Sequence, residues 1–285
     1  MIRRLCIVGV GLIGGSLARA LRAAGEVEEI VGTSRNGAHL QRAEELGVID
    51  RYDTDIASAV QGADLVFVSV PLGAVRAVFG ALKGHLADDA VLTDAGSVKA
   101  SVVADARAVF GSAPPNFVPG HPIAGTEKSG VEASFAELYQ DRRVILTPVE
   151  ETRAQAVATV RAMWEAAGAK VTEMPVDHHD EVLAATSHLP HALAFTLVES
   201  LARMSDQREI FEYAAGGFRD FTRIASSDPV MWRDICLANR APLLAIIAHF
   251  TGDLAELAEL INDGDGERLL EFFETAKRAR DAFAG

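Results

Sequence analysis

The sequence is poor in cysteine and in basic residues, and it lacks long apolar runs. Only Cys6 and Cys236 are cysteines among 285 residues, so a disulfide framework is excluded. Lysine and arginine number 27 against 40 acidic residues, which gives a formal net charge of −13. A chain this acidic has no electrostatic footprint for nucleic acid. We therefore expect no nucleic acid as a partner. No unbroken apolar run reaches the roughly 18 residues of a membrane span, so we expect no membrane as a partner either.

Hydrophobic residues make up 49% of the chain, which is enough to bury a sizeable core and excludes a disordered protein. Both cysteines lie in apolar stretches, where we expect them as small core residues of a protein in a reducing compartment. The N-terminal segment has basic and then apolar residues, as a signal peptide does. It is dense in glycine, however, and continues directly into a helix pattern. We therefore expect a cytoplasmic protein.

Up to residue 174, short apolar runs alternate with segments of helical spacing. The runs at residues 4–10, 29–33 and 64–70 predict buried strands, and Pro71 ends the last of these. The alternation continues with strands at 90–93, 116–118 and 143–147, and with helices at 12–24, 37–46, 73–82, 98–109 and 152–167. This order is typical of βαβ units, so it predicts a parallel sheet with helices on both faces.

The pattern changes after Pro175, and no convincing strand follows. Helical spacing of apolar residues dominates instead, over residues 178–203, 206–214, 229–262 and 266–283. We therefore predict an α/β domain over residues 1–174, followed by an all-α domain over residues 175–285.

Three glycines follow the first predicted strand and open the first predicted helix. Gly9, Gly11 and Gly14 have G-x-G-x-x-G spacing in the strand–turn–helix context that dinucleotide binding requires. The first glycine permits a tight turn, the second lets a pyrophosphate approach the backbone, and the third allows helix and strand to pack closely. Leu12 and Ile13 begin the helix, whose free N–H groups and dipole favour an anion. The first domain is therefore predicted to be a Rossmann-type dinucleotide-binding domain.

The end of the second predicted strand bears on the choice of dinucleotide. A carboxylate about 20 residues after the loop would hold the ribose 2′-hydroxyl of NAD, but Ser34 and Arg35 stand there. A hydroxyl and a guanidinium suit a 2′-phosphate, so we expect NADP to be preferred, with NAD as the alternative. The alternative applies if Arg35 is simply a solvated loop residue.

Two segments just past predicted strands carry reactive side chains. Ser97 lies in TDAGSVK, where it bonds a ligand, caps a helix that begins at Val98, or does both. His121 lies between Gly120 and Pro122 in a glycine-punctuated loop. A histidine titrates near neutral pH and can take a proton from an alcohol, although a structural histidine bonded to backbone is the alternative.

The helical half contributes histidines and arginines. His188 and His191 are three residues apart and share a helix face, but no third ligand at metal-site spacing is nearby, so we expect no metal. Arg219 and Arg223 are four residues apart; they either bind a carboxylate or form an ordinary salt-bridged helix start. Trp232, nine residues further on, suits a core or an interface.

Five ordered motifs resemble those of the prephenate/arogenate (cyclohexadienyl) dehydrogenases of tyrosine biosynthesis. They are VGVGLIGGS, TDAGSVK, GHPIAGTEKSG, SHLPHALAF and GGFRDFTRIASSDPVMW, and the resemblance extends over essentially the whole chain. It implies a helical domain that builds a homodimer. It also implies oxidative decarboxylation of a cyclohexadienol, prephenate or arogenate, with hydride transfer to NAD(P) and an aromatic product.

The resemblance also implies roles for individual residues. His121 bonds the ring hydroxyl and helps to remove its proton, with Ser97 as its partner. Arg223 anchors the side-chain carboxylate, and His188 and His191 line the same pocket. Further substrate contacts are expected from Thr126, Glu127, Trp232 and, where related enzymes carry a lysine, Arg219; Val70 and Pro71 are expected to border the cofactor.

Two other functions remain to be weighed. An NADP-dependent β-hydroxyacid dehydrogenase or imine reductase has a similar architecture, but it commonly uses a lysine on a second-domain helix, and the only lysine after Lys170 is Lys277. A non-catalytic dinucleotide sensor would need neither His121 nor Arg223. An acidic chain repels an anionic substrate and a phosphorylated cofactor unless positive groups are concentrated at the binding sites. We expect such positive potential at the helix start after Gly11, at Arg35, and at Arg219 with Arg223.

Overall fold

The computed structural model describes residues 1–204 and 207–284. The chain divides into two compact units, Met1–Arg240 and the residues from Ala241 onward. All the site residues expected from the sequence lie in the first unit. This unit keeps the helices between residue 174 and Ala238 together with the α/β domain. Compactness therefore divides the chain at a later position than the change in secondary-structure pattern.

A six-stranded parallel sheet forms the centre of the first unit. Its strand order is β3-β2-β1-β4-β5-β6, so the order reverses between β1 and β4. The strands are β1 (Ile2–Val8), β2 (Val27–Thr33), β3 (Arg51–Asp53), β4 (Leu65–Val68), β5 (Val91–Asp94) and β6 (Phe117–Val118). This is the doubly wound order in which ligands bind beyond the carboxyl ends of the strands, at the reversal.

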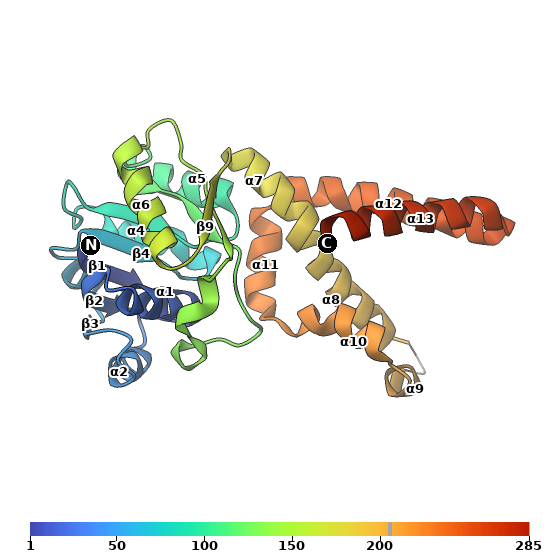
Figure 1. Ribbon diagram of the computed structural model, residues 1–285, viewed down its shortest axis with the longest axis horizontal. Helices are drawn as coiled ribbons and strands as arrows, with labels where there is room; N and C mark the ends of the chain where they lie inside the picture. The colour runs from blue at the N-terminus through green and yellow to red at the C-terminus, as the bar shows by residue number, and fades with distance from the viewer. Residues whose placement is uncertain (205–206, 285) are drawn as a thin grey trace. The chain divides into compact units, whose positions relative to one another are not determined.

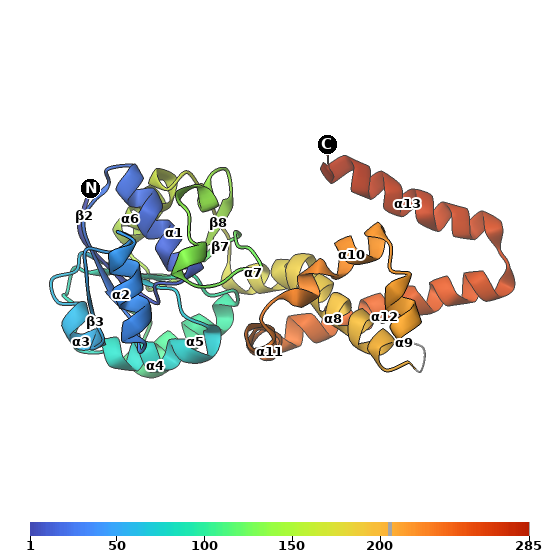
Figure 2. The ribbon, with the colours of Figure 1, turned by 90° about the horizontal axis from the view of Figure 1, so that it is seen from below.

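Helices cover both faces of this sheet (Figure 2). On one side are α1 (Leu12–Ala23), α2 (Gly37–Glu45) and α6 (Ala154–Ala166); on the other are α3 (Ile56–Ala59), α4 (Leu72–Leu82) and α5 (Lys99–Phe110). Side chains alternate between the two cores along each strand, so Leu5 and Ile7 face one core while Cys6 and Val8 face the other. The predicted parallel sheet with two covered faces is thus confirmed.

One predicted strand belongs elsewhere. Residues 143–147 were expected in the parallel sheet, but β8 (Arg143–Leu146) lies in a separate sheet of three strands, between β7 (Gly120–Pro122) and β9 (Lys170–Glu173). It pairs antiparallel with β7 and parallel with β9. Pro119 has no N–H to donate, and it ends β6 after two residues, so the chain turns there and starts a new sheet. Two 3₁₀ turns, η1 (Val131–Ala133) and η2 (Ala136–Tyr139), connect β7 to β8.

The described residues beyond Pro175 contain helices and no strand, as the sequence predicted (Figure 1). They form α7 (Val176–Leu183), the π-helical turn η3 (Ala184–His188), α8 (Leu189–Ala202), α9 (Gln207–Glu212), α10 (Gly216–Thr222), the 3₁₀ turn η4 (Arg223–Ser226), α11 (Pro229–Ala238), α12 (Arg240–Asp263) and α13 (Gly266–Ala284).

Two of the long predicted helices are interrupted. The segment 178–203 contains the π turn η3 just before Pro190, and the segment 229–262 is broken at Asn239, whose φ of −98° and ψ of 35° lie outside the α-helical range. The side chain of Asn239 is held by two long-range hydrogen bonds. Apolar spacing does not register such polar contacts, so it predicted continuous helices.

Among the described residues, no helix is both long and apolar enough to cross a membrane. In the same part of the chain, no group of three or more histidine, cysteine or acidic side chains is arranged to hold a metal ion. Both cysteines are free. Burial in the core raises the pKa of the Cys6 thiol to about 12, so this thiol stays protonated.

Candidate active site

Two of the three glycines of the loop occupy positions that only glycine fits. Gly9 has φ of +97°, and a Cβ there would lie 2.6 Å from the carbonyl oxygen of Ser69. A Cβ on Gly14 would lie 2.5 Å from the carbonyl oxygen of Gly9, so this glycine allows α1 to approach β1 closely. Around Gly11, by contrast, a Cβ would meet nothing within 4 Å. The open side of the loop thus leaves room for a phosphate group against the backbone.

The N-terminus of α1 faces this open space. Its cap residue Gly11 offers no side-chain hydrogen bond, so the first N–H groups, those of Leu12 and Ile13, have no capping partner. The carbonyl of Ile13 accepts a 2.6 Å hydrogen bond from the Tyr139 hydroxyl, which ties this turn to η2. Free N–H groups and an open cradle fit the pyrophosphate of a nicotinamide dinucleotide.

The loop after β2 leaves a guanidinium exposed. Ser34 Oγ accepts a 3.2 Å hydrogen bond from the Asn36 N–H, and Asn36 caps α2. Arg35 is exposed and forms no ion pair with the residues that the structure describes. The carboxylate of Asp53, at the end of the adjacent β3, accepts a hydrogen bond from the Asp55 N–H instead. Hydrogen bonds from the Ser58 side chain and the Asp55 N–H hold the pKa of Asp53 below its usual range.

His121 begins a buried chain of three side chains. It lies on β7, immediately after the carboxyl edge of the parallel sheet, and only 9% of its surface is exposed. Its Nδ1 is 2.9 Å from Nε2 of His179, and Nδ1 of His179 is 2.7 Å from Oδ1 of Asp180. His179 and Asp180 come from α7, so this helix supplies the partners of His121.

The chain fixes which nitrogen of His121 carries the proton. Two N–H groups, those of Lys99 and Ala100, also donate to the Asp180 carboxylate. Burial opposes its charge, but these bonds and the His179 ring hold the pKa of Asp180 below its usual range. An ionised carboxylate only accepts, so His179 donates through Nδ1, and its neutral ring accepts through Nε2. His121 must then donate through Nδ1, which leaves a lone pair on Nε2.

Both histidines are neutral at physiological pH. Burial lowers the pKa of His121 well below 6.5. Repulsion from His179 and His188, whenever these are protonated, and from the Lys99 charge lowers it further. Burial also lowers the pKa of His179, although the hydrogen bond to Asp180 opposes this effect. Since the unprotonated form of His121 is the one that accepts a proton, the site is set up as a base at neutral pH.

A buried ion pair holds the backbone on which His121 is carried. The side chains of Lys99 and Asp94 are both 0% exposed, and Lys99 Nζ donates to Asp94 Oδ2 at 2.5 Å. Lys99 Nζ also donates to the carbonyl of Gly120 at 2.6 Å, while Asp94 Oδ1 accepts the Gly120 N–H at 3.1 Å. Both backbone groups of the residue before His121 are therefore fixed. Burial lowers the pKa of Lys99, and the Asp94 charge opposes this effect.

Ser97 does not cap a helix. The helix α5 begins at Lys99, its cap residue is Val98, and no side chain of the local sequence caps it. The Asp180 carboxylate of α7 performs this task by accepting the N–H groups of Lys99 and Ala100 at 2.8 and 2.9 Å. The N-cap interpretation of Ser97 is therefore wrong. Its half-buried hydroxyl, just past β5, forms no hydrogen bond within the described part of the chain and is free for a ligand.

His188 and His191 meet on one tryptophan. The His191 ring stacks on Trp232 with centroids 3.7 Å apart, and the His188 ring meets the same indole edge-on at 6.1 Å. His191 Nδ1 donates to the carbonyl of Ser187 at 2.9 Å, so the neutral ring presents the lone pair of Nε2. Trp232 is 8% exposed, and its Nε1–H has no partner among the described residues. The expected shared face is confirmed, and it leaves a buried donor available.

Arg223 lies near this cluster and is only loosely held. Burial lowers the pKa of His191, and the nearby Arg223 charge lowers it further. Arg223 pairs with Glu127 at 3.5 Å, with 61% and 50% of the two side chains exposed. Thr126 is exposed in the same loop as Glu127, and its hydroxyl accepts the Lys128 N–H at 3.2 Å. Arg219 is exposed on α10, but Arg223 begins the 3₁₀ turn η4, so the two do not share one regular helix.

Two family models match the chain almost from end to end. The one described as "Prephenate dehydrogenase, nucleotide-binding domain" matches residues 17–173, and "Prephenate dehydrogenase, dimerization domain" matches residues 175–275. The chain belongs to the prephenate dehydrogenase family. Membership confirms the fold class, the dehydrogenase activity and the place in tyrosine biosynthesis that the five motifs predicted.

Individual members of the family are similar over nearly the whole chain. Cyclohexadienyl dehydrogenase of Zymomonas mobilis is 41% identical, over 98% of this chain and 95% of the relative. Prephenate dehydrogenase of Bacillus subtilis is 35% identical, over 97% of this chain and 75% of the relative. The crystal structure of Aquifex aeolicus prephenate dehydrogenase with hydroxyphenyl propionate and NAD⁺ superposes with a TM-score of 0.93 at 41% identity, covering 99% of both chains.

Several polar residues that orient the site carry no signal in the sequence motifs of this dehydrogenase. His179 and Asp180 orient His121, while Lys99 and Asn239 hold backbone and side chains around it. His178, the neighbour of His179, is exposed instead. The apolar spacing of α7, which buries Leu183 four residues after His179, could have placed His179 on the inner face. Its pairing with a residue 58 positions earlier leaves no local signal.

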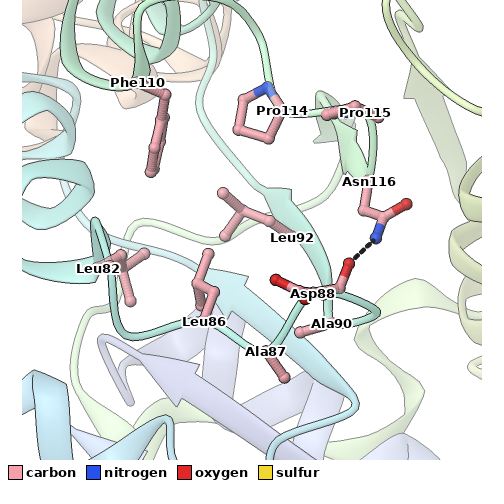
Figure 3. A pocket seen from close by; sticks show the side chains of 11 residues that line it. Leu82, Leu86, Ala87, Asp88, Ala90, Leu92, Phe110, Pro114, Pro115 and Asn116 are labelled. Atoms are coloured by element: carbon pink, nitrogen blue, oxygen red, sulfur yellow. Dashed lines mark hydrogen bonds between the residues drawn. The ribbon is translucent and has the colours of Figure 1, made fainter.

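A hollow lies at the amino end of β5, whereas His121 follows the carboxyl edge of the sheet. Figure 3 shows the side chains that line this hollow. Leu82, Leu86, Leu92 and Phe110 line it near the amino end of β5, and Asn116 closes one side by donating to the carbonyl of Asp88 at 3.0 Å. Its volume of about 200 Å³ is below the range typical of ligand sites. This hollow is therefore a poor candidate for the active site, and the carboxyl edge of the sheet is the better one.

Proposed function

We propose that the chain catalyses the oxidative decarboxylation of prephenate, of arogenate, or of both, to 4-hydroxyphenylpyruvate or tyrosine. The observation that supports the proposal is the chain His121–His179–Asp180, which leaves an unprotonated Nε2 on a histidine that follows the carboxyl edge of the parallel sheet. The Aquifex aeolicus relative, whose crystal structure contains hydroxyphenyl propionate and NAD⁺, supports this substrate class.

His121 acts as the general base in this mechanism. Its Nε2 accepts the proton of the ring hydroxyl, while Nδ1–H remains bonded to His179, so the positive charge that develops is shared toward Asp180. Such a positioned base contributes roughly 10²–10⁴-fold. A nicotinamide dinucleotide, when bound, supplies the hydride acceptor for the ring carbon that carries the hydroxyl. The free hydroxyl of Ser97 hydrogen-bonds the same ring oxygen and steadies it for His121.

Arg223 binds the side-chain carboxylate of the substrate. Its pair with Glu127 is exposed, and exposed pairs contribute only about 0–1 kcal/mol, so exchange of Glu127 for a substrate carboxylate costs little. His188 and His191 border the same space through Trp232, whose unpartnered Nε1–H offers a further donor. Thr126 and Arg219 are exposed, and we assign them outer contacts with the substrate.

The cofactor is held by the glycine loop, the first turn of α1, and Val70 with Pro71 after β4. We further propose that NADP is preferred over NAD. Arg35 is exposed with no ion pair to described residues, and no carboxylate follows Thr33 in the loop, so a 2′-phosphate meets a free guanidinium.

The same proposal extends to the organisation of the chain. We place the boundary between the dinucleotide-binding domain and the helical domain at residue 174, which agrees with family models that meet between residues 173 and 175. The match to a dimerisation domain supports a homodimer built through the helical half. Its free cysteines agree with a cytoplasmic setting.

Steady-state kinetics with both substrates and both cofactors test the proposal. Carbon dioxide release and NAD(P)H formation should occur together and in equal amounts with prephenate, arogenate or both, and more efficiently with NADP. Ser34→Asp should shift the preference toward NAD, since a carboxylate binds the 2′-hydroxyl and repels a 2′-phosphate. Turnover of neither substrate refutes the reaction, whereas an NADP/NAD ratio that Ser34→Asp leaves unchanged refutes only the assignment of the cofactor contact.

A further inference from the structure

Asn239 is a buried amide at the break between α11 and α12. It is 2% exposed, and its side-chain nitrogen Nδ2 has two partners on elements that are distant in sequence. It donates to the backbone carbonyl of Asp180 at 2.8 Å, and it lies 2.9 Å from Nδ1 of His188. The two hydrogens of the amide nitrogen are therefore matched to two acceptors.

The orientation of this amide follows from its first partner. The carbonyl oxygen of Asp180 only accepts, so the amide must turn its NH₂ group, and not its oxygen, toward Asp180. The same NH₂ group then faces His188 Nδ1, which must present a lone pair. A neutral imidazole with a lone pair on Nδ1 carries its proton on Nε2.

We propose that Asn239 is a positioning residue that holds His188 as the neutral tautomer protonated at Nε2. Protonation of Nδ1 would set two donors against each other at 2.9 Å, so the cationic form is disfavoured by geometry as well as by burial.

The groups around His188 agree with this assignment. Burial lowers the pKa of His188 to about 4; the Asp180 charge opposes this effect, and charges on His179 and His191 add to it. His121 lies near His188 as well, since a positive charge on His188 would lower the pKa of His121. Near neutral pH, His188 thus contributes a hydrogen-bond donor and no charge.

Asp180 consequently sets two histidines to opposite roles. Through its carboxylate and His179, it leaves a lone pair on Nε2 of His121. Through its carbonyl and Asn239, it leaves a proton on Nε2 of His188. One ring accepts a proton from the substrate, and the other donates a hydrogen bond to a substrate oxygen. This second role rests on the proposed function, but the tautomer itself does not.

A neutral donor suits an oxygen whose negative charge disappears during the reaction. The ring carboxylate gives up its charge as it leaves as carbon dioxide, so a cation beside it would stabilise the ground state more than the transition state. A neutral N–H also orients the carboxylate, but it stabilises the charged ground state less than a cation would and so raises the barrier less. A neutral Nε2–H on His188 is therefore suited to an oxygen of the departing carboxylate.

The tautomer is measured by NMR of the full-length protein with ¹⁵N-labelled histidine. The His188 signals are identified by their loss in His188→Gln. In the wild type we expect an unprotonated Nδ1 and a protonated Nε2 that persist from pH 8 to about pH 5. Asn239→Asp replaces the donor by an acceptor, so Nδ1 should become protonated and the ring should titrate at higher pH. A wild-type His188 protonated at Nδ1 overturns the proposal, even if no Asn239 variant folds.

Kinetics distinguish positioning from a purely structural role. His188→Gln keeps a donor near the Nε2 position, whereas His188→Asn keeps only a group near Nδ1, so His188→Gln should retain more kcat/KM. Asn239→Leu should lower kcat/KM about tenfold to a hundredfold, as loss of a tautomer-fixing partner does at metal-bound histidines. In the His188→Gln background, the same change should have little further effect. A full loss in that background refutes the link to His188.

Asn116→Leu is the matched control, because this amide also donates to a backbone carbonyl but lies at the opposite edge of the sheet. It should leave kcat/KM and the His188 signals unchanged. If the wild type turns over neither prephenate nor arogenate, the proposed function fails while the NMR result still decides the tautomer.

Discussion

Single residues in this site act through the hydrogen bonds that fix their protons. His121 would be a weak catalytic base if its ring could exchange tautomers freely. The tautomer with a proton on Nε2 cannot accept a proton from the substrate at that nitrogen. The carboxylate of Asp180 removes that freedom through His179. The reactive nitrogen is therefore determined by a residue that His121 does not touch.

This arrangement predicts distinct results for the two histidines. His121→Asn should lower kcat by roughly 10²–10⁴-fold, since the base is lost, with cofactor affinity nearly unchanged. His179→Leu should lower kcat less, and His179→Gln should recover part of that loss, because its amide oxygen can accept the Nδ1–H of His121. Steady-state kinetics and cofactor titration measure these effects.

The pH profile follows from the same contacts. The pKa of His121 lies well below 6.5, so its base form is complete at pH 7 and is lost only as pH falls through that lowered value. The acid limb of kcat/KM should therefore lie below pH 6.5. An acid limb above pH 6.5, or a His179→Gln variant as impaired as His179→Leu, would contradict this account.

At the scale of elements, the site is assembled where strand ends and helix starts meet. The ion pair Lys99–Asp94 connects β5, α5 and the start of β7, and it is closed to water. The pair stabilises the fold only while both partners are present, because one buried charge without a partner lowers the free energy of unfolding far more than the removal of both charges.

Removing one partner of this pair should destabilise the protein strongly. Lys99→Met leaves the Asp94 carboxylate buried and unpaired, at a cost of about 3–5 kcal/mol in the free energy of unfolding. The double variant Lys99→Met/Asp94→Asn should recover much of that loss. The matched control is Lys170→Met, which breaks an exposed pair with Asp141 and should change stability by less than about 1 kcal/mol. Chemical denaturation at fixed protein concentration compares them; equal losses for the two lysines would be inconsistent with the argument.

The sequence predicts elements better than it predicts their polar contacts. Apolar runs and glycines located the parallel sheet and the glycine loop, because those signals are local. The placement of β8 in a second sheet depended on Pro119, and the breaks at η3 and Asn239 depended on partners far along the chain. The expected residues His121, His188, His191 and Trp232 do come together, but the residues that orient them are paired across 51 to 59 positions.

At the scale of the whole molecule, the helical unit from Ala241 onward exposes apolar side chains that a stable monomer would cover. Ile261, Leu270 and Phe273 are 61%, 59% and 51% exposed. Several exposed apolar residues on a small helical unit are consistent with an association surface, and the family model that matches residues 175–275 is a dimerisation domain. We expect these side chains to lie in the interface of the proposed homodimer.

Phe273→Asp should therefore convert the dimer to a monomer, because a charge would be buried in an apolar interface. Analytical ultracentrifugation measures the change, and dehydrogenase assays should show a parallel loss of activity. Thr275→Asp introduces the same charge at an exposed polar position two residues away and should remain dimeric. A monomeric wild type, or a Phe273→Asp variant that stays dimeric, would exclude this surface.

Asp180 also makes the chemistry conditional on completed folding. Its carboxylate receives the N–H groups of residues 80 and 81 positions earlier, at the start of α5, and it orients His179 at the same time. Until α7 docks on α5, neither the helix start nor the base has its partner. A nascent or partly unfolded chain can thus assemble its glycine loop early without exposing an active base, and catalysis begins only when the two distant segments have met.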